Sequence, residues 1–245
     1  MINNKKITVV MPAYNAGATL YETYKNISSD IVDEVILVDD CSADNTVELS
    51  KSLGIKTIVH EKNLGYGANQ KTCYKEALNS GADIIIMLHP DFQYDPRLIP
   101  ALSCMLAYDN YDCAIASRFL VHSALKSKMP KYKYIANRFL TWFQNLCLNK
   151  GLSEYHSGYR AFSRKVLEGI DIEKLDNDFI FDNQMLALIY YKGFSIGEIS
   201  CPTKYFDAAS SISFLRSMKY GMGVLGVSIL YLVSRIGLRF SIFKN

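Results

Sequence analysis

Apolar runs of four or five residues alternate with amphipathic segments through the first half of the chain. The runs at 7–11, 34–38, 56–59, 84–88 and 114–117 are short and bounded by polar residues, which predicts strands. Helical patterns lie between them, at 18–27, 46–53, 67–79 and 97–108. Strands that alternate with helices pair in parallel, so the pattern predicts an α/β fold with a mostly parallel central sheet flanked by helices.

The second half of the chain follows a different pattern. The alternation weakens after Arg118, where a basic loop precedes a predicted helix at 135–148. A further helix is expected at 179–191, and short strands at 195–199 and 203–206. With 245 residues, 49% of them hydrophobic, the chain is long enough to bury one large core.

Charge and cysteine content exclude several classes of protein. The formal net charge is only +3, which gives no overall attraction to nucleic acid. The 6 cysteines include no C-x-x-C pair, so neither a zinc site nor a disulfide framework is indicated, and a reducing cytoplasm fits best. The first strand follows Lys5 and Lys6 without the apolar region of a signal peptide, so we expect no export.

The C-terminal segment is apolar and basic. Residues 220–234 carry no charge, and the basic residues on either side are Arg216, Lys219, Arg235 and Arg239. A membrane span needs roughly 20 apolar residues, so this segment fits a helix in the membrane interface better than a span. A helix packed on the protein itself, or on a second subunit of a homodimer, is the alternative.

The strand predicted at 84–88 ends in side chains that bind metals. His89, Asp91 and Gln93 follow it, and ligands of open α/β sheets bind at the carboxyl ends of such strands. Asp91 and Gln93 offer the oxygen ligands that Mg²⁺ and Mn²⁺ prefer, and His89 offers a nitrogen that Mn²⁺ accepts. An ordinary turn marked by prolines is the alternative.

Other strand ends carry candidate nucleotide contacts. The ring of Tyr14, after the first strand, would stack on a base, and Asp40, after the second, would accept a hydrogen bond from a base N–H. Gly67 lies at the start of a predicted helix, where backbone N–H groups hold phosphate. The chain has neither a Walker A loop nor a G-x-G-x-x-G after the first strand, which argues against an NTPase and a Rossmann dehydrogenase.

Seven short motifs together resemble one family. They are PAYNAG, VDDCSADNT, NLGYGANQ, HPDFQYDP, ASRF, SGYRAFSR and FIFDNQM, and they span nearly the whole chain. In this order and spacing they resemble a family 2 glycosyltransferase of the dolichyl-phosphate mannose synthase-like group. The resemblance implies a nucleotide-diphospho-sugar transferase fold of the glycosyltransferase A type, an inverting transfer, and a Mn²⁺ or Mg²⁺ ion that bridges the diphosphate.

The resemblance also implies which residues bind the donor. Asp91 and Gln93 would hold the metal, and His89 stands where the family often has a first Asp. His89 would then be a ligand itself, or Asp91 and Gln93 would hold the ion with waters. The residues expected to bind the nucleotide sugar are Pro12, Ala13, Tyr14, Asn15, Asp40, Gly67, Asp91 and Arg118.

The acceptor side is less fully specified. Asp182 would be the base for a hydroxyl acceptor, whereas a polyprenyl phosphate needs none because it is already largely ionised at neutral pH. Arg160 and Lys204 would add charge-assisted hydrogen bonds to phosphate. The expected catalytic residues are therefore Asp182, Asp91 and Arg160.

The basic stretch from Arg118 to Lys150 contains no acidic residue and includes several aromatic ones, which suits a lipid headgroup. We therefore expect transfer to polyprenyl phosphate or a lipid-linked glycan on the inner face of the membrane. A soluble or polysaccharide hydroxyl acceptor and a non-catalytic nucleotide-binding protein are the alternatives. We expect a catalytic domain at 1–211, divided into a donor half at 1–118 and an acceptor half at 119–211, followed by a membrane or dimer helix at 212–245.

Overall fold

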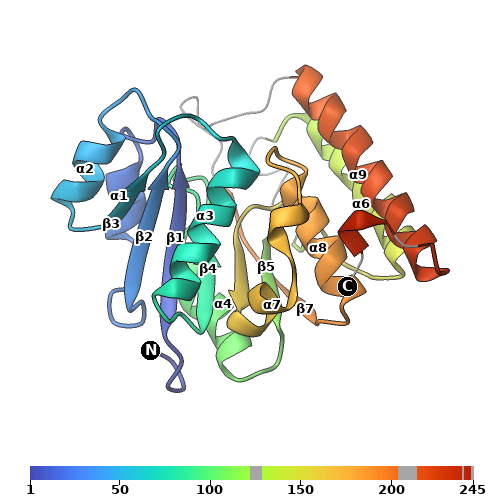
Figure 1. Cartoon of the computed structure of the whole chain (residues 1–245), viewed down its shortest axis with the longest axis horizontal. Coiled ribbons are helices and arrows are strands. Elements are labelled where there is room, and N and C mark those ends of the chain that lie inside the picture. The colour runs from blue at the N-terminus through green and yellow to red at the C-terminus, as the bar shows by residue number, and fades with distance from the viewer. Residues whose placement is uncertain (122–128, 204–213, 239, 244–245) are drawn as a thin grey trace.

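The computed structural model describes residues 1–121, 129–203, 214–238 and 240–243, and it confirms the α/β fold (Figure 1). Seven strands form one sheet in the order β3-β2-β1-β4-β6-β5-β7. The strands are β1 Ile7–Ala13, β2 Glu34–Asp39, β3 Lys56–Val59, β4 Ile84–Met87, β5 Cys113–Ser117, β6 Arg160–Ser163 and β7 Ile196–Ser200. The helices are α1 Leu20–Lys25, α2 Thr46–Ser52, α3 Tyr66–Asn79, α4 Ile99–Ala107, α6 Lys131–Leu148, α7 Arg164–Gly169, α8 Phe181–Tyr191 and α9 Phe214–Arg235. Three short 3-10 helices are η1 Pro96–Leu98, η2 Ile172–Lys174 and η3 Ser241–Phe243.

The sheet is mostly parallel, as predicted, with one exception. β6 runs antiparallel between β4 and β5, and the sequence analysis did not predict it. A strand of four residues that begins with an arginine gives no apolar run to detect. The pairing places Arg160 opposite Met87, so the first residue of β6 lies beside the last residue of β4.

The core lies on both faces of the sheet because side chains alternate along each strand. Val10 packs with Tyr74 of α3 in one cluster, whereas its neighbour Val9 belongs to a second cluster with Leu102 of α4. The predicted strand at 203–206 is not confirmed at Thr203, which is not in a strand, and its other residues lie outside the described part of the chain.

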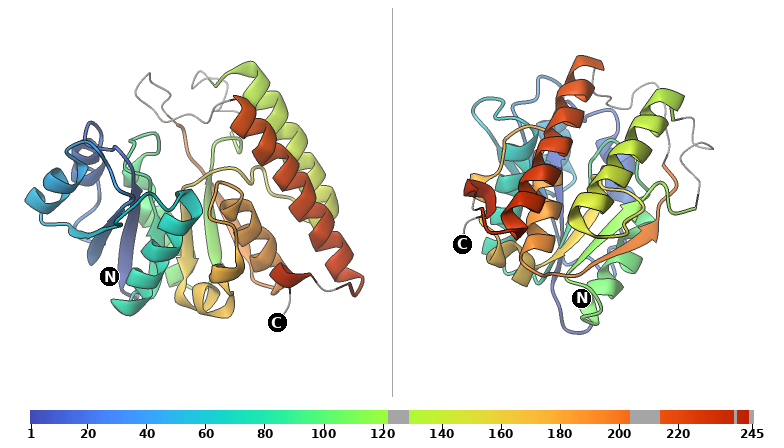
Figure 2. Two further views of the ribbon diagram at one scale, coloured as in Figure 1. Left: turned by 45° about the horizontal axis from the view of Figure 1, so that its top comes forward. Right: turned by 90° about the vertical axis from the view of Figure 1, so that its right-hand side faces the viewer.

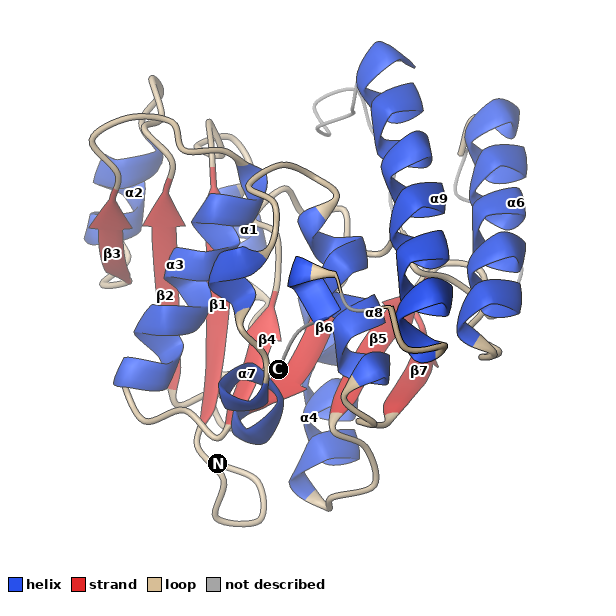
Figure 3. Ribbon diagram, turned by 45° about the vertical axis from the view of Figure 1, so that its right-hand side comes forward, coloured by secondary structure: helices blue, strands red, loops and turns tan. Residues whose placement is uncertain are grey.

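Helices α6 and α9 lie side by side at the end of the molecule away from β3 (Figure 2). α8 lies between this pair and the sheet, and α9 packs against both α6 and α8 (Figure 3). Within the described residues, Arg216–Arg235 is the one helix whose length and composition would allow it to cross a membrane. The division of the chain at residue 211 stays a prediction.

Candidate active site

The loops after β1 and β2 hold each other at the carboxyl edge of the sheet. The N–H of Asn15 donates to Oγ of Ser42 at 2.8 Å, and Oδ1 of Asn15 accepts from the N–H of Ala43 at 2.9 Å. The N–H of Gly17 donates to Oδ2 of Asp44 at 2.9 Å. Asn15 therefore has a structural role in joining the two loops, and its predicted contact with the donor stays a prediction.

Tyr14 is an exposed aromatic residue at this edge. Pro12 and Ala13 are buried at the end of β1, whereas the side chain of Tyr14 is 57% exposed. An exposed aromatic ring beside two strand ends suits stacking on a base. The nucleotide contacts of Pro12, Ala13 and Tyr14 stay predictions.

Asp40 organises the loop that leads into α3. One carboxylate oxygen accepts the N–H of Leu64 at 2.8 Å, and the other accepts the N–H of Gly65 at 2.9 Å. Nδ1 of His60 lies 2.8 Å from the same carboxylate. The side chain is only 4% exposed, so a base that bonds Asp40 would share an already occupied carboxylate. That contact remains a prediction.

Gly67 serves close packing. Its N–H donates to the carbonyl of Asn177 at 2.8 Å, and a Cβ at this position would lie 2.6 Å from the carbonyl oxygen of Asp176. The glycine therefore lets the segment before α8 approach α3. Its N–H is thus used within the protein, and the predicted contact of Gly67 with the nucleotide sugar stays a prediction.

Asp91 and Gln93 form a pair directly after β4. The N–H and Nε2 of Gln93 donate to the two carboxylate oxygens of Asp91, at 3.1 and 2.7 Å. Among the described residues no group of three or more His, Cys, Asp or Glu would hold an ion by itself. One carboxylate and one amide fit Mg²⁺ or Mn²⁺, because such ions take their remaining ligands from water and substrate phosphates.

His89 faces the interior of the site. Its Nε2 lies 3.1 Å from the hydroxyl of Tyr66, and the two rings are stacked at 5.5 Å between centroids. A Cβ at Gly158 would lie 2.6 Å from the same nitrogen, so the absence of a side chain there makes room for the imidazole. Because Nε2 is in a hydrogen bond with Tyr66, an ion would have to be bound through Nδ1. The two alternatives for His89 stay predictions.

Asp182, the second residue of α8, is bonded through both carboxylate oxygens. The hydroxyl of Tyr66 donates to Oδ2 at 2.7 Å, and Nε2 of Gln70 donates to Oδ1 at 3.0 Å. Burial, together with the charge of Asp182, raises the pKa of Tyr66 well above its ordinary value. Tyr66 therefore stays a proton donor at neutral pH, and Asp182 stays its acceptor.

Arg160 contacts the backbone and the carboxylate of Asp182. Its guanidinium donates to the carbonyls of Ser157 at 2.7 Å, Asp182 at 2.7 Å and Tyr155 at 3.1 Å. NH1 lies 3.5 Å from Oδ1 of Asp182, and the side chain is 1% exposed. All three of its nitrogens bond within the protein, which favours a positioning role, and the expected contact of Arg160 with a phosphate stays a prediction. Lys204 lies outside the described residues.

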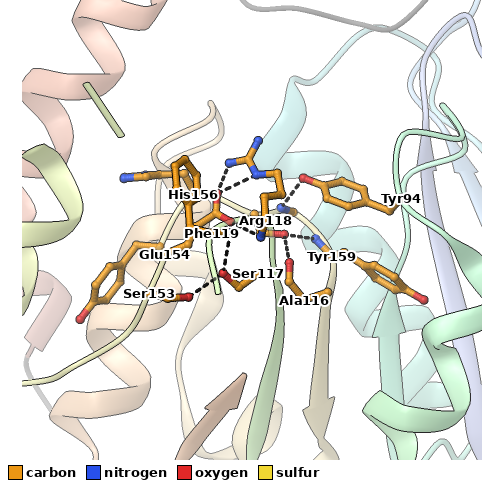
Figure 4. A network of polar contacts seen from close by, with 12 residues as sticks. Tyr94, Ala116, Ser117, Arg118, Phe119, Ser153, Glu154, His156 and Tyr159 are labelled. Carbon is orange, nitrogen blue, oxygen red and sulfur yellow. Dashed lines mark hydrogen bonds and ion pairs between the residues drawn. The ribbon is translucent and has the colours of Figure 1, made fainter. Parts of the chain in front are cut away.

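Arg118 pairs with a buried carboxylate, as Figure 4 shows. Nε of Arg118 donates to Oε1 of Glu154 at 2.7 Å, and its backbone N–H donates to Oε2 at 2.8 Å. Glu154 is fully buried, whereas the side chain of Arg118 keeps 12% of its surface exposed. A buried counter-ion fixes the orientation of the guanidinium. The predicted diphosphate contact of Arg118 stays a prediction.

His156 joins this edge to the C-terminal helix. Its Nδ1 lies 2.9 Å from the hydroxyl of Tyr220, which belongs to α9. Burial and the nearby charges of Arg118 and Arg160 lower the pKa of His156 to about 3, so the ring is neutral at pH 7. A residue of the predicted membrane helix therefore contacts the loop that supplies Glu154.

A match to a known family decides the identity of the chain. The sequence model of glycosyl transferase family 2 matches residues 8–171, which include the strand ends described above. The chain belongs to glycosyl transferase family 2. The expectation that its motifs carried is thereby confirmed.

Curated relatives cover most of this family 2 chain. An uncharacterised protein of Methanocaldococcus jannaschii, MJ1222, is 30% identical over 86% of this chain and 86% of its own length. A UDP-N-acetylglucosamine–dolichyl-phosphate N-acetylglucosaminyltransferase of Methanococcus voltae is 26% identical over 83% of this chain and 88% of its own length. A dolichol-phosphate mannosyltransferase of Pyrococcus furiosus is 26% identical over 69% of this chain, which spans 49% of that protein.

Solved structures confirm the glycosyltransferase fold. Glucosyl-3-phosphoglycerate synthase of Mycobacterium tuberculosis, in complex with UDP, superposes with a TM-score of 0.70 at 18% identity and covers 97% of this chain and 82% of its own. The same protein in complex with Mn²⁺, UDP and phosphoglyceric acid gives a TM-score of 0.67 at 18% identity, over 97% of this chain and 81% of its own. At this identity the likeness shows the fold alone.

Three residues of the site were not predicted from the sequence. Tyr66 and Gln70 of α3 bond Asp182, and Glu154 pairs with Arg118. Glu154 did leave a signal, because it is the first acidic residue after a long basic stretch. The contact between α3 and α8 left no signal in the sequence, because 116 residues separate Tyr66 from Asp182.

Proposed function

We propose that this family 2 glycosyltransferase transfers a sugar from a UDP- or GDP-sugar to polyprenyl phosphate, with inversion at the anomeric carbon. The observation that supports a phosphate acceptor is that both carboxylate oxygens of Asp182 accept hydrogen bonds within the protein, from Tyr66 and Gln70. This arrangement suits a fixed orienting group better than a base that must take up the proton of a hydroxyl acceptor. A phosphate acceptor needs no base.

The names of two relatives support the same acceptor class. Both are named as transferases that use dolichyl or dolichol phosphate, and one of them matches this chain over most of both lengths. A lipid-borne acceptor would place the protein at the inner face of the membrane, in contact with the cytoplasm. The donor class is supported by the fold, because the superposed synthase binds UDP.

In the proposed reaction an oxygen of the acceptor phosphate attacks the anomeric carbon from the side opposite the diphosphate. The bond from carbon to the leaving oxygen breaks, and its electron pair leaves with the nucleoside diphosphate. A divalent cation, when bound, would neutralise charge on this leaving group. Asp91 and Gln93 would hold it, Tyr14 would stack on the base, and Arg118 would bond the diphosphate.

Asp182 acts in this scheme as an orienting group for the sugar or the acceptor. Tyr66, Gln70 and Arg160 fix its position, so a hydroxyl of the sugar would meet a carboxylate that is already aligned. Such alignment lowers the entropic cost of reaching the transition state.

The Asp182→Asn variant tests the assignment through its pH profile. With polyprenyl phosphate as acceptor, we expect a reduced rate and an acidic limb of kcat/KM that stays in place, because that limb follows the acceptor phosphate, whose pKa is about 6. Loss of the acidic limb in the variant would show that Asp182 is the base and would favour the hydroxyl acceptor.

A further inference from the structure

Helix α6 exposes an apolar stripe. Ile135, Phe139, Trp142 and Leu146 are 67%, 52%, 59% and 66% exposed. Their spacing of four, three and four residues places them on one side of the helix. The opposite side, with Leu140 and others, is buried against the protein. An amphipathic helix normally turns its apolar side inward, and α6 carries apolar residues on both sides.

Helix α9 repeats this arrangement. Its exposed residues Met218, Met222, Ile229, Leu232 and Ile236, the last just beyond the helix end, are 52%, 65%, 50%, 48% and 76% exposed. These positions again lie on one side of a helix, at spacings of three, four or seven residues. The buried side carries Val224, Val227 and Tyr231, which are at most 5% exposed.

The two stripes form one outward surface, which we call the α6–α9 face. It comprises the exposed residues Ile135, Phe139, Trp142, Leu146, Met218, Met222, Ile229, Leu232 and Ile236. Both helices lie in front when the molecule is viewed from that end (Figure 2, right). Because each buries its other side in the protein, both stripes point away from it. Soluble monomers rarely expose contiguous apolar patches of this kind.

The charges carried by the two helices have one sign, and Asp178, before α8, pairs with one of them, Lys219, at 3.2 Å. The sequence has no acidic residue at 113–153 or after Asp207, so neither helix carries one. The exposed basic residues of the two helices are Lys131, Arg138, Arg216, Lys219 and Arg235. Two copies of such a face would bring like charges together, whereas an anionic surface would attract them.

We propose that the α6–α9 face docks on a lipid bilayer with anionic headgroups. The apolar stripes enter the headgroup region while the basic residues contact the headgroups. This proposal rests on the proposed function in one respect: an enzyme with a lipid-borne acceptor must meet that acceptor at the membrane. Its physical basis is separate, since it needs no assumption about the sugar or the acceptor.

The same helix that forms this face reaches the candidate active site. Tyr220 of α9 bonds His156, and Glu154, two residues earlier, pairs with Arg118. Both helices also begin at the end of the molecule to which the arrowheads of β2 and β3 point (Figures 2 and 3). Docking through this face therefore holds Tyr220, and with it the loop that supplies Glu154, near the membrane surface.

The experiment uses Trp142, which is the 1 tryptophan of the chain. We would titrate the full protein with vesicles of phosphatidylglycerol or phosphatidylcholine, without nucleotide sugar or polyprenyl phosphate. The proposal expects a blue-shifted emission and quenching by brominated acyl chains with the anionic vesicles, and at least about tenfold weaker binding to the neutral ones. Because no substrate is present, failure to bind vesicles and failure to transfer sugar are separate results.

Substitutions locate the surface. Leu146→Glu and Met222→Glu should each weaken partition into anionic vesicles by about tenfold or more, because each removes a buried apolar side chain from the bilayer. Tyr108→Glu is the matched control. Tyr108 is 60% exposed, but it follows α4, which is not part of the α6–α9 face. The control should bind like the unsubstituted protein.

Three outcomes would overturn the proposal. One is an emission maximum that ignores anionic vesicles, and another is equal binding to both lipids. The third is a blue shift that rises with protein concentration in the absence of vesicles, together with a dimer in size-exclusion chromatography, which would assign the α6–α9 face to a second copy of the chain.

Discussion

The hydroxyl of Tyr66 donates a hydrogen bond of 2.7 Å to Oδ2 of Asp182, and so connects the start of α3 to the start of α8. The same hydroxyl lies 3.1 Å from Nε2 of His89. One side chain thus contacts both His89, two residues beyond the end of β4, and the expected catalytic carboxylate. The relationship makes Tyr66 the centre of the candidate active site.

Replacing Tyr66 by Phe should weaken both folding and activity. Hydrogen bonds to charged groups contribute about 1.5–3 kcal/mol, so the free energy of unfolding should fall by about 2 kcal/mol and the melting temperature by several degrees. Transfer should slow as Asp182 loses its alignment. Denaturant unfolding and steady-state kinetics measure both effects. Tyr21→Phe, on an exposed side chain of α1, should change neither.

Replacing Arg160 by Lys should destabilise the protein strongly. A lysine ammonium cannot reproduce the forked contacts of the guanidinium, and it would leave buried carbonyls and Asp182 without their donors. Each buried acceptor that is left without a donor costs about 1–3 kcal/mol. Chemical denaturation measures the loss. Arg138→Lys on the exposed side of α6 is the control and should unfold like the original. An unfolding curve for Arg160→Lys that matches the control would contradict the positioning role.

His156 should make folding less stable in mild acid. Its pKa is lowered to about 3 in the folded protein by burial and by Arg118 and Arg160, against about 6.5 in the unfolded chain. As pH falls below about 6.5, the unfolded state takes up a proton that the folded state refuses, so stability decreases down to about pH 3. Between pH 6.5 and 5 this group should account for about 2 kcal/mol.

The His156→Gln variant isolates this contribution, because its amide still meets the hydroxyl of Tyr220 but does not titrate. We expect the difference in unfolding free energy between the two proteins to shift by about that amount in favour of the variant at pH 5. Other titrating groups cancel in the difference. Parallel stability curves over this pH range would contradict the lowered pKa.

Asp91 should carry the metal dependence of nucleotide binding. Ligand binding to the folded state raises the melting temperature by mass action. The shift produced by UDP, GDP or CDP should grow with Mn²⁺ in the original protein, and the growth should vanish in Asp91→Ala. Asp30→Ala, an exposed carboxylate of the α1–β2 connection, should behave like the original. A metal-dependent shift that survives in Asp91→Ala would place the ion elsewhere.

The sequence predicted the donor half of the fold well because its signals are local. Buried strands such as β4 are continuous apolar runs, and the polar side chains of Asp40 and Asp91 mark where strands end. The helical segment at 131–148 was also expected in part, although α6 begins earlier than the predicted position 135. Its first turn consists of lysines and tyrosines, so the helical spacing of apolar residues cannot be recognised there.

The acceptor half was harder to predict because its contacts join distant segments. β6 is short and antiparallel. Its pairing with β4 places Arg160 where its guanidinium donates to the carbonyl of Asp182. The role of Gly67 also depends on tertiary packing, because the N–H that a helix start offers to phosphate is taken by Asn177. No local pattern reports which of several partners a polar group meets.

The acceptor assay tests the central claim most directly. The purified protein, with Mn²⁺ and each of a panel of UDP- and GDP-sugars, would be given a short polyprenyl phosphate or the matching polyprenol, which has a hydroxyl in place of the phosphate. The account predicts a glycosylated lipid from the phosphate with one of the donors, and none from the alcohol. Transfer to the alcohol, with none to the phosphate, would contradict it.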